Sequence, residues 1–290
     1  MKIYWLLVTL LLLVGCTSSE LKDAQTGIDD GFKTITIEDS VVIKVIPQEN
    51  DGDVLKGCSW NLQTFGMKKA KDDYVMGEYN KTLSRLGCDF IVVQEIRDVD
   101  AVKSFGRFCN MFSGFTCLMS SRAGRSSSKE QFGVLYNSNL KVNGVRDFNP
   151  DPTDRWERPP FLINFTTGNY SFSVVIVHVK PDKVETKKEI KALEDEFGVF
   201  TDKVVIIGDM NAGCSYLSYS DEKELFKDWT WFIPFEADTT SGNSKCGFDR
   251  VVVNQVFKKS VSAVGVWIWD VPLNVSDHYP IWVQIKRGVV

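Results

Sequence analysis

Residues 203–216 have the sequence Lys203-Val-Val-Ile-Ile-Gly-Asp-Met-Asn-Ala-Gly-Cys-Ser-Tyr216. The four β-branched residues from Val204 to Ile207 predict a short strand that is buried on both faces. Gly208, Asp209 and Asn211 follow directly, so a carboxylate and an amide stand where a central strand ends. Ligand groups collect at strand ends in α/β sheets. An ordinary turn is the alternative, because glycine, aspartate and asparagine are also common turn residues.

The composition limits the possible size of the fold but does not indicate a function. The chain has 290 residues, of which 43% are hydrophobic and 25% are charged. This is enough for one large domain or for two smaller ones. Aromatic residues make up 12% of the chain, which argues against disorder. The net charge of −4 excludes a global basic field, so a polyanion site would have to be local or supplied by a bound cation.

The N-terminus has the features of an export signal. The apolar run from Ile3 to Val14 is shorter than the roughly 20 residues of a membrane-spanning helix but suits a signal-peptide core. Leu13-Val-Gly-Cys16 resembles the cleavage box of bacterial lipoproteins. It implies a signal peptide at 1–16 and lipidation of Cys16, which would anchor the chain to a membrane. A buried helix, or a plain signal peptide with an incidental cysteine, is the alternative. Residues 17–53 are then a tether and an N-terminal extension.

Six cysteines remain when Cys16 is set aside: Cys58, Cys88, Cys109, Cys117, Cys214 and Cys246. An even number in an exported chain favours disulfides, with buried thiols as the alternative. The spacing alone leaves the pairing open, and no C-x-x-C metal motif occurs.

The chain beyond residue 54 predicts one domain with many strands and few helices. Helices are expected at 74–86, before Gly87, near 102–108 and 222–226, and from the capping box Asp182-Lys-Val-Glu185 to Phe200. Strands are expected at 34–38, 41–46, 55–61, 89–95, 115–119, 132–136, 140–145, 161–165, 171–179, 204–207, 248–253, 263–269 and 279–285. No internal repeat or linker divides residues 54–290. We therefore expect two packed sheets flanked by helices.

Both histidines of the sequence lie at predicted strand boundaries. His178 ends one strand, and His278 precedes the last one. A lone histidine is more often structural than functional. Here further polar residues lie at strand ends as well: Asn61, Glu95, Asp209, Asn211 and Asp249. The whole set indicates a site.

Such a set suits metal-assisted hydrolysis of a phosphodiester. This reaction needs a general base for water and a general acid for the leaving oxygen, and histidine can take either role near neutral pH. Each imidazole needs a carboxylate to fix its orientation and tautomer. The remaining oxygen ligands suit Mg²⁺, Mn²⁺ or Ca²⁺, and the lack of cysteine and histidine ligand spacing disfavours zinc.

Six motifs carry a family resemblance. They are Trp60-Asn-Leu-Gln-Thr-Phe-Gly66, Val93-Gln-Glu-Ile-Arg-Asp98, Gly208-Asp-Met-Asn-Ala-Gly-Cys-Ser-Tyr216, Ala237-Asp-Thr-Thr240, Phe248-Asp-Arg-Val-Val-Val253 and Ser276-Asp-His-Tyr-Pro280. In this order they resemble the deoxyribonuclease I family of the endonuclease/exonuclease/phosphatase superfamily, across residues 55–286. The resemblance implies an α/β fold, a four-layer α/β/β/α sandwich of two mixed, largely antiparallel sheets flanked by helices.

The resemblance also implies roles for the polar residues. His278 would be the general base, oriented by Asp249, and His178 the general acid, oriented by Glu130. Glu95, Asn61 and Asp277 would hold a divalent metal, Mg²⁺ or Mn²⁺. Asp209 and Asn211 would engage a second metal or the scissile phosphate. Asp238 and Thr240 match a calcium site, and Cys214 with Cys246 a structural disulfide.

DNA contacts are implied at Arg97, Arg158 and Arg125. Arg125 lies in the basic loop 121–130, for which a solvated loop is the alternative. The family has a tyrosine two residues before the loop glutamate, where this chain has Ser128, so the grip on DNA is expected to differ. Cys109 with Cys117 is our expectation for a further bridge.

The sequence therefore predicts an exported, metal-dependent endonuclease that hydrolyses DNA, expected to be double-stranded, at the cell surface, in the periplasm or after secretion. Another phosphodiesterase or phosphatase of the superfamily, such as one that acts on phospholipid head groups, is the alternative. A non-catalytic binding protein on the same scaffold is a third possibility.

Overall fold

The computed structural model describes residues 35–37, 40–45, 54–97, 99, 101–125, 127–268 and 271–287. The expected signal peptide at 1–16, the lipidation site Cys16 and most of the tether lie outside the described residues. Within the described part of the chain, none of the helices has the length and apolar character needed to cross a membrane.

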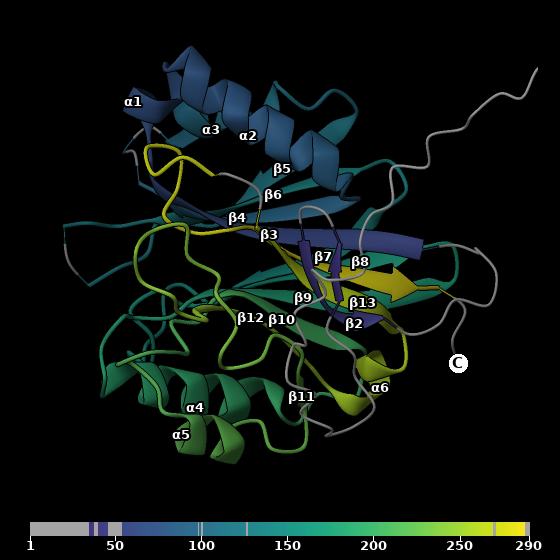
Figure 1. The fold of residues 1–290 in the computed structure, drawn as a ribbon. Coiled ribbons are helices and arrows are strands. Elements are labelled where there is room, and N and C mark those ends of the chain that lie inside the picture. Colours follow the sequence, from purple (N-terminus) through teal and green to yellow (C-terminus); the bar gives the residue numbers. More distant parts are fainter. Residues whose placement is uncertain are drawn as a thin grey trace, which may run out of the picture.

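Two sheets form the centre of the molecule (Figure 1). The strands of the eight-stranded sheet are, in spatial order, β1 (Ile35–Ile37), β2 (Ser40–Val45), β13 (Val261–Trp267), β14 (Ile281–Lys286), β3 (Val54–Phe65), β4 (Phe90–Ile96), β6 (Gln131–Asn137) and β5 (Phe115–Met119). Those of the six-stranded sheet are β11 (Thr230–Trp231), β12 (Asp249–Val253), β10 (Val204–Asp209), β9 (Tyr170–His178), β8 (Phe161–Thr167) and β7 (Lys141–Asp147). The pairs β3–β4 and β9–β10 are parallel, and the other pairs are antiparallel.

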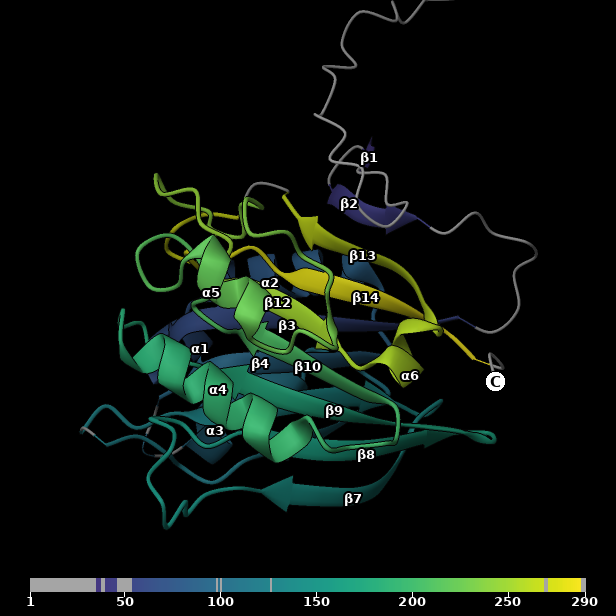
Figure 2. The same cartoon turned by 90° about the horizontal axis from the view of Figure 1, so that it is seen from below.

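Helices cover the outer faces of both sheets. The first sheet carries α1 (Met67–Ala70), α2 (Asp73–Leu86) and α3 (Ala101–Cys109), and the second carries α4 (Glu185–Phe197) and α5 (Tyr219–Glu224). Figure 2 shows α4 and α5 lying across the second sheet. The short helix α6 (Gln255–Lys258) follows β12. The expected four-layer α/β/β/α sandwich is confirmed.

Local signals explain where two of these helices begin and end. The Asp72 side chain accepts hydrogen bonds from the amides of Tyr74 and Val75, and Gly87 ends α2 in the left-handed region at φ 61°. Before α4, the Asp182 side chain accepts hydrogen bonds from the amides of Val184 and Glu185. Glu185 pairs with Lys188, so the expected capping box is only half formed, and α4 ends at Phe197 rather than Phe200.

The central strands are buried on both faces, as the sequence of β10 predicts. Val205 and Ile207 point into the core between the sheets, whereas Val204 and Ile206 pack against α4 and its surroundings. Because side chains alternate along a strand, Asp209 continues the row that points between the sheets. The short elements α1, α6 and β11 were not predicted, since they span only four, four and two residues and have too little periodicity to be recognised.

Candidate active site

The register of the second sheet brings three predicted site residues together. β10 pairs in parallel with β9 and antiparallel with β12, so Asp209 lies opposite His178 on one side and Asp249 on the other. Gly208, at φ 144°, permits this close pairing, because a Cβ there would lie 2.2 Å from the carbonyl oxygen of Val177. The polar end of β10 therefore belongs to a cluster of ionisable side chains.

The first sheet adds two polar side chains to this cluster. Asn61 on β3 donates hydrogen bonds from Nδ2 to Glu95 Oε1 (3.1 Å) and, across the space between the sheets, to Asp209 Oδ2 (3.0 Å). Glu95 has a φ of 64° and lies at a register shift of β4 between Val93 and Ile96. A bulge of this kind re-aims a side chain, and such strained backbone is typical of functional sites.

His178 forms a buried pair with Glu130. Its Nδ1 lies 2.7 Å from Glu130 Oε2, and the other oxygen of Glu130 accepts a 3.1 Å hydrogen bond from Arg158. Burial by itself would raise the pKa of Glu130, but the charge and hydrogen bond of His178, together with Arg158 and Arg97, lower that pKa to about 2. Burial and Arg158 act to lower the pKa of His178, but Glu130 and Asp209 outweigh them and raise it. Each partner of the pair therefore favours the charged form of the other.

His278 forms the second buried pair, with Asp249. The distance from His278 Nδ1 to Asp249 Oδ2 is 2.8 Å. Burial acts to lower the pKa of His278, but the charges of Asp249 and Asp209 and the hydrogen bond with Asp249 outweigh it and raise the pKa to about 10. The indole of Trp60 donates a 2.8 Å hydrogen bond to the His278 carbonyl, and the Ser276 hydroxyl accepts one from the His278 amide at 3.0 Å. These bonds fix the loop that carries the imidazole.

The two imidazoles approach the same carboxylate. Nε2 of His178 lies 3.4 Å from Asp209 Oδ2, and Nε2 of His278 lies 3.7 Å from the same oxygen. Each Nδ1 is occupied by its own carboxylate, so the two Nε2 atoms remain to exchange protons with a ligand. This arrangement can place a proton donor and a proton acceptor on either side of one bond.

The donor set suits a hard divalent cation. Asp209, Asp249 and His278 each offer a ligand atom, and these atoms lie within 4.8 Å of one another. Asp249 Oδ1 is buried without a hydrogen-bond partner among the described residues. Glu95 adds a further carboxylate, an oxygen ligand of the kind that Mg²⁺ and Ca²⁺ prefer, and Asn61 lies beside it with Nδ2 toward Glu95 and Asp209. The residues present therefore fit such an ion.

Two further predicted residues flank the cluster. Asn211, at φ 47°, donates its backbone amide to Asp209 Oδ1 (2.9 Å) and its Nδ2 to the Val179 carbonyl (2.8 Å). Asp277 is half-exposed, and its Oδ1 lies 3.9 Å from His278 Nε2. The structure thus places both next to the histidines.

Residues 58–278 match the model of the "Endonuclease/Exonuclease/phosphatase family". The chain belongs to this family. It is 28% identical to "Deoxyribonuclease-1-like 1" of Sus scrofa over 287 residues, which cover 89% of this chain and 90% of the relative. It is 29% identical to "Deoxyribonuclease-1" of Gallus gallus, with 80% of this chain and 92% of the relative covered. The predicted resemblance is confirmed, and these relatives support a nuclease or another phosphodiesterase.

Two solved structures share the fold of this chain. An endonuclease/exonuclease/phosphatase from Bacteroides vulgatus gives a TM-score of 0.61 at 13% identity, with 81% of this chain and 99% of that chain covered. D. rerio TDP2 complexed with single strand DNA product gives a TM-score of 0.60 at 14% identity, with 81% and 100% covered. At these identities the comparison establishes the sandwich fold of the family and no more.

Within this family fold, the three predicted DNA-contacting arginines have different surroundings. Arg97, about one third exposed, pairs with Glu95 (2.9 Å) and Glu130 (3.4 Å) at the rim of the cluster. Arg158 is mostly buried, and it binds Glu130 and the carbonyls of His178 and Val179. Its contacts are those of a residue that holds the His178 pair.

Arg125 lies apart from the cluster, in the loop before Glu130. Its guanidinium binds the side chain and the carbonyl of Asp154, and its backbone amide binds Glu157. The basic loop is therefore partly neutralised by the acidic residues beside it.

The predicted calcium residues lie in a loop attached to the His278 segment. Thr240 donates hydrogen bonds from its amide and hydroxyl to Asp238 Oδ1, at 3.0 and 2.9 Å, and forms a β-bridge with His278. The expected disulfide Cys214–Cys246 closes this region. The expected bridge Cys109–Cys117 is also present, and Cys58 pairs with Cys88.

Sequence reasoning missed Lys69 and Tyr79, which lie beneath the cluster. Both bind the carbonyls of Leu62 and Val275. Lys69 stands in a run of lysines in a four-residue helix, and Tyr79 is one apolar position of α2. Nothing in their sequence context distinguishes them from a surface lysine and a core tyrosine.

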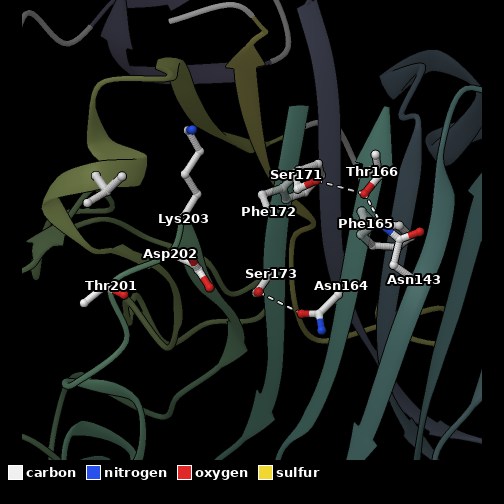
Figure 3. Close-up of a pocket in the computed structure, with 11 residues that line it drawn as sticks. Asn143, Asn164, Phe165, Thr166, Ser171, Phe172, Ser173, Thr201, Asp202 and Lys203 are labelled. Atoms are coloured by element: carbon white, nitrogen blue, oxygen red, sulfur yellow. Dashed lines mark hydrogen bonds between the residues drawn. The ribbon is translucent and has the colours of Figure 1, made fainter. Parts of the chain in front are cut away.

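A separate hollow of about 330 Å³ lies at the other end of β10, beside Lys203 (Figure 3). Its polar side chains are bonded to one another: Ser173 donates to Asn164, and the hydroxyls of Thr166 and Ser171 pair at 3.0 Å. Among the described residues that line it, Asp202 is the one carboxylate, and none is a histidine. The candidate site therefore remains the cluster at the Asp209 end of β10.

Proposed function

We propose that this protein is a divalent-metal-dependent endonuclease that hydrolyses phosphodiester bonds of DNA. One observation carries the proposal: the Nε2 atoms of two carboxylate-paired histidines lie 3.4 Å and 3.7 Å from the same oxygen of Asp209. Hydrolysis of a phosphodiester needs a base and an acid on opposite sides of phosphorus. The similarity to deoxyribonucleases favours DNA as the substrate.

In the proposed mechanism, His278 is the general base. Asp249 accepts a hydrogen bond from Nδ1–H and so leaves the lone pair of Nε2 for the attacking water. The water oxygen forms a bond to phosphorus as its proton passes to Nε2. Since carboxylates hold His278 protonated at neutral pH, the base works only when nearby positive charge lowers its pKa.

His178 is the proposed general acid. Glu130 keeps the imidazole protonated and turned toward Asp209. As the bond from phosphorus to the leaving oxygen breaks, that oxygen takes the proton from His178 Nε2. Asn211 stands beside Asp209 and would donate a hydrogen bond to the phosphate.

Glu95, Asn61, Asp209 and Asp277 would hold Mg²⁺ or Mn²⁺. When bound, the ion neutralises phosphate charge and polarises the phosphoryl group. Asp238 and Thr240 would hold Ca²⁺ and order the loop that is bridged to His278. Arg97 and, less directly, Arg125 would face the DNA backbone, whereas Arg158 is turned inward to Glu130; Ser128 stands at the position where the family has a tyrosine.

We further propose that residues 54–290 are the catalytic domain, that 1–16 is a signal peptide, and that 17–53 tether the domain to a lipid on Cys16. Three disulfides support export, because disulfides persist in oxidising compartments. Fractionation of cells that express the full chain tests the anchor. Cys16→Ala should move the protein from the membrane to the soluble fraction, and an unchanged distribution would contradict lipidation.

A plasmid-nicking assay tests the activity. Protein that lacks residues 1–16 is incubated with supercoiled double-stranded DNA, with Mg²⁺ and Ca²⁺, and with or without a chelator. We expect nicking that the chelator abolishes, and a loss of about 100-fold or more for His178→Ala and for His278→Ala. Absence of nicking under all metal conditions would refute the nuclease. Hydrolysis of a phospholipid or another small phosphate ester in its place would point to the alternative phosphodiesterase.

A further inference from the structure

Lys69 links two segments that are far apart in the sequence, the end of β3 and the segment before His278. Its Nζ donates hydrogen bonds to the carbonyls of Leu62 (2.9 Å), Gln63 (2.5 Å) and Val275 (2.7 Å). An ammonium group has three N–H donors, so all three are used. Lys69 is thus bound inside the protein and cannot serve as a phosphate-binding lysine.

Tyr79 reinforces the same link from α2. Its fully buried hydroxyl lies 2.9 Å from the Leu62 carbonyl and 2.7 Å from the Val275 carbonyl. The ring packs edge-on against Trp60, with centroids 5.1 Å apart, and Trp60 holds the His278 carbonyl. Two side chains therefore bind the same pair of carbonyls.

The first of these segments, the end of β3, positions the candidate metal ligands. Leu62 and Gln63 directly follow Asn61, whose Oδ1 accepts the Gln63 amide at 2.9 Å. Gln63 and Thr64 both have positive φ, 49° and 52°, a conformation that ordinary residues keep only when their surroundings enforce it. In this conformation the Thr64 amide donates a 2.7 Å hydrogen bond to Glu95 Oε2.

The second segment, Val275 to His278, positions the proposed base. Val275 precedes Ser276, Asp277 and His278, and the Ser276 hydroxyl donates to the Asn61 carbonyl at 2.6 Å. The carbonyls that meet at Lys69 thus belong to the two segments that carry Asn61 and His278. Without the hydrogen bonds of Lys69 and Tyr79, the distance between these two segments would be less tightly fixed.

The charge of Lys69 fits this location. Burial lowers the pKa of Lys69 to about 8, and the carboxylates of Asp277 and Glu95 act against that change. The two acids that favour the ammonium are both candidate metal ligands. The charges of both acids therefore act on the Lys69 ammonium, whose hydrogen bonds go to backbone carbonyls.

We propose that Lys69, assisted by Tyr79, is a positioning residue that fixes the end of β3, which carries Asn61, relative to the segment that carries His278. The proposal rests on the proposed function, which assigns Asn61 as a metal ligand and His278 as the general base. A lysine outside the catalytic cluster thus holds the metal ligands and the proton acceptor in one fixed arrangement. Neither residue acts on substrate.

The test compares Lys69→Met with Lys68→Met. The first keeps the length and apolar stem of the side chain but removes the charge and the three donors. The second removes the same charge from an exposed position in the same helix and serves as the matched control. Mg²⁺ and Mn²⁺ binding are measured directly by calorimetry without substrate, alongside the dependence of kcat on metal concentration.

We expect Lys69→Met to weaken metal binding by on the order of tenfold or more, as is typical for residues that orient metal ligands. The kcat at saturating metal should fall as well, because His278 is no longer held at its spacing from the metal ligands. Lys68→Met should match the wild-type protein in both measurements. Wild-type metal affinity and kcat in a folded Lys69→Met protein would overturn the proposal, even if its melting temperature fell.

Tyr79→Phe keeps the test open if Lys69→Met fails to fold. It removes one hydroxyl and should weaken metal binding in the same direction but by less, whereas unchanged affinity and kcat would overturn the role of the pair. A wild-type protein that binds metal but hydrolyses no phosphodiester would refute the proposed function alone. The calorimetric comparison would still decide the role of Lys69.

Discussion

Asn61 on the first sheet donates a 3.0 Å hydrogen bond to Asp209 on the second. The side chains that fit a metal ion are therefore divided between the two sheets. An ion bound there would join the sheets, and unfolding would have to release it.

Metal binding should stabilise the fold. At free Mg²⁺ about 100 times its Kd, the expected gain in the free energy of unfolding is about 2.7 kcal/mol, visible as a rise in melting temperature. Asp209→Asn should lose most of this rise, whereas Asp195→Asn, on the exposed face of α4, should keep it. Equal Mg²⁺-induced shifts in the two variants would contradict a metal site at Asp209.

His278 should stay protonated well above neutral pH in the metal-free protein. The two histidines of the chain make this measurable by NMR, because His178→Gln leaves a single imidazole to titrate. In the presence of chelator its midpoint should lie near pH 10. Saturating Mg²⁺ should lower this midpoint, because a cation beside Asp209 offsets the charge that favours the imidazolium. A midpoint near 6.5 without metal would refute the tight coupling to Asp249 and Asp209.

The same residue should also shape stability at alkaline pH. Its folded pKa is raised from 6.5 to about 10, so its contribution is fully present below pH 6.5 and is lost as the pH rises through 10. In chelator, the difference in free energy of unfolding between wild-type and His278→Gln should therefore shrink from pH 6.5 to pH 10. Urea unfolding at several pH values measures it. A difference that grows with pH would contradict a raised pKa of His278 in the folded protein.

Glu130 should act in the opposite direction, at acidic pH. Its pKa is lowered from 4.5 to about 2, so its contribution is present above pH 4.5 and is lost as the pH falls through 2. The difference in unfolding free energy between wild-type and Glu130→Gln should be largest above pH 4.5 and decrease toward pH 2. A pH-independent difference would show that the ionic pair with His178 contributes nothing to the fold.

The three disulfides should differ in their effect on stability. Cys214–Cys246 and Cys58–Cys88 close loops of 32 and 30 residues, and Cys109–Cys117 one of 8. Loop-closure entropy predicts losses of about 3–4 kcal/mol for each long loop and less for the short one. Paired Cys→Ala variants, compared by urea unfolding, measure these losses. The largest loss at Cys109–Cys117 would contradict this order.

The sequence predicted the second sheet's centre well because the signal is local. Val204 to Ile207 are buried on both faces as their run of β-branched residues indicates, and Asp209 ends the strand. The motifs around Asn61, Glu95, Asp249 and His278 were sufficient to identify the family. Each of these signals needs only neighbouring residues, since burial and side-chain alternation repeat along a strand.

Other features of the site could not be predicted in this way. Glu95 reaches the cluster through a positive φ at a bulge, and Arg158 turns inward to Glu130 instead of outward. Arg125 is held by Asp154. The sequence specifies which residue types are present at these positions, but their partners come from segments that meet only after folding.

The sequence by itself thus determined most of the strands, the family and the candidate residues for acid–base and metal chemistry. The tertiary structure alone decided which of these residues touch. His178 meets Glu130 across 48 positions, and Lys69 meets Val275 across 206. The physical reason is that periodicity and burial act between neighbours along the chain, whereas distances between two sheets are set by the packing of the core between them.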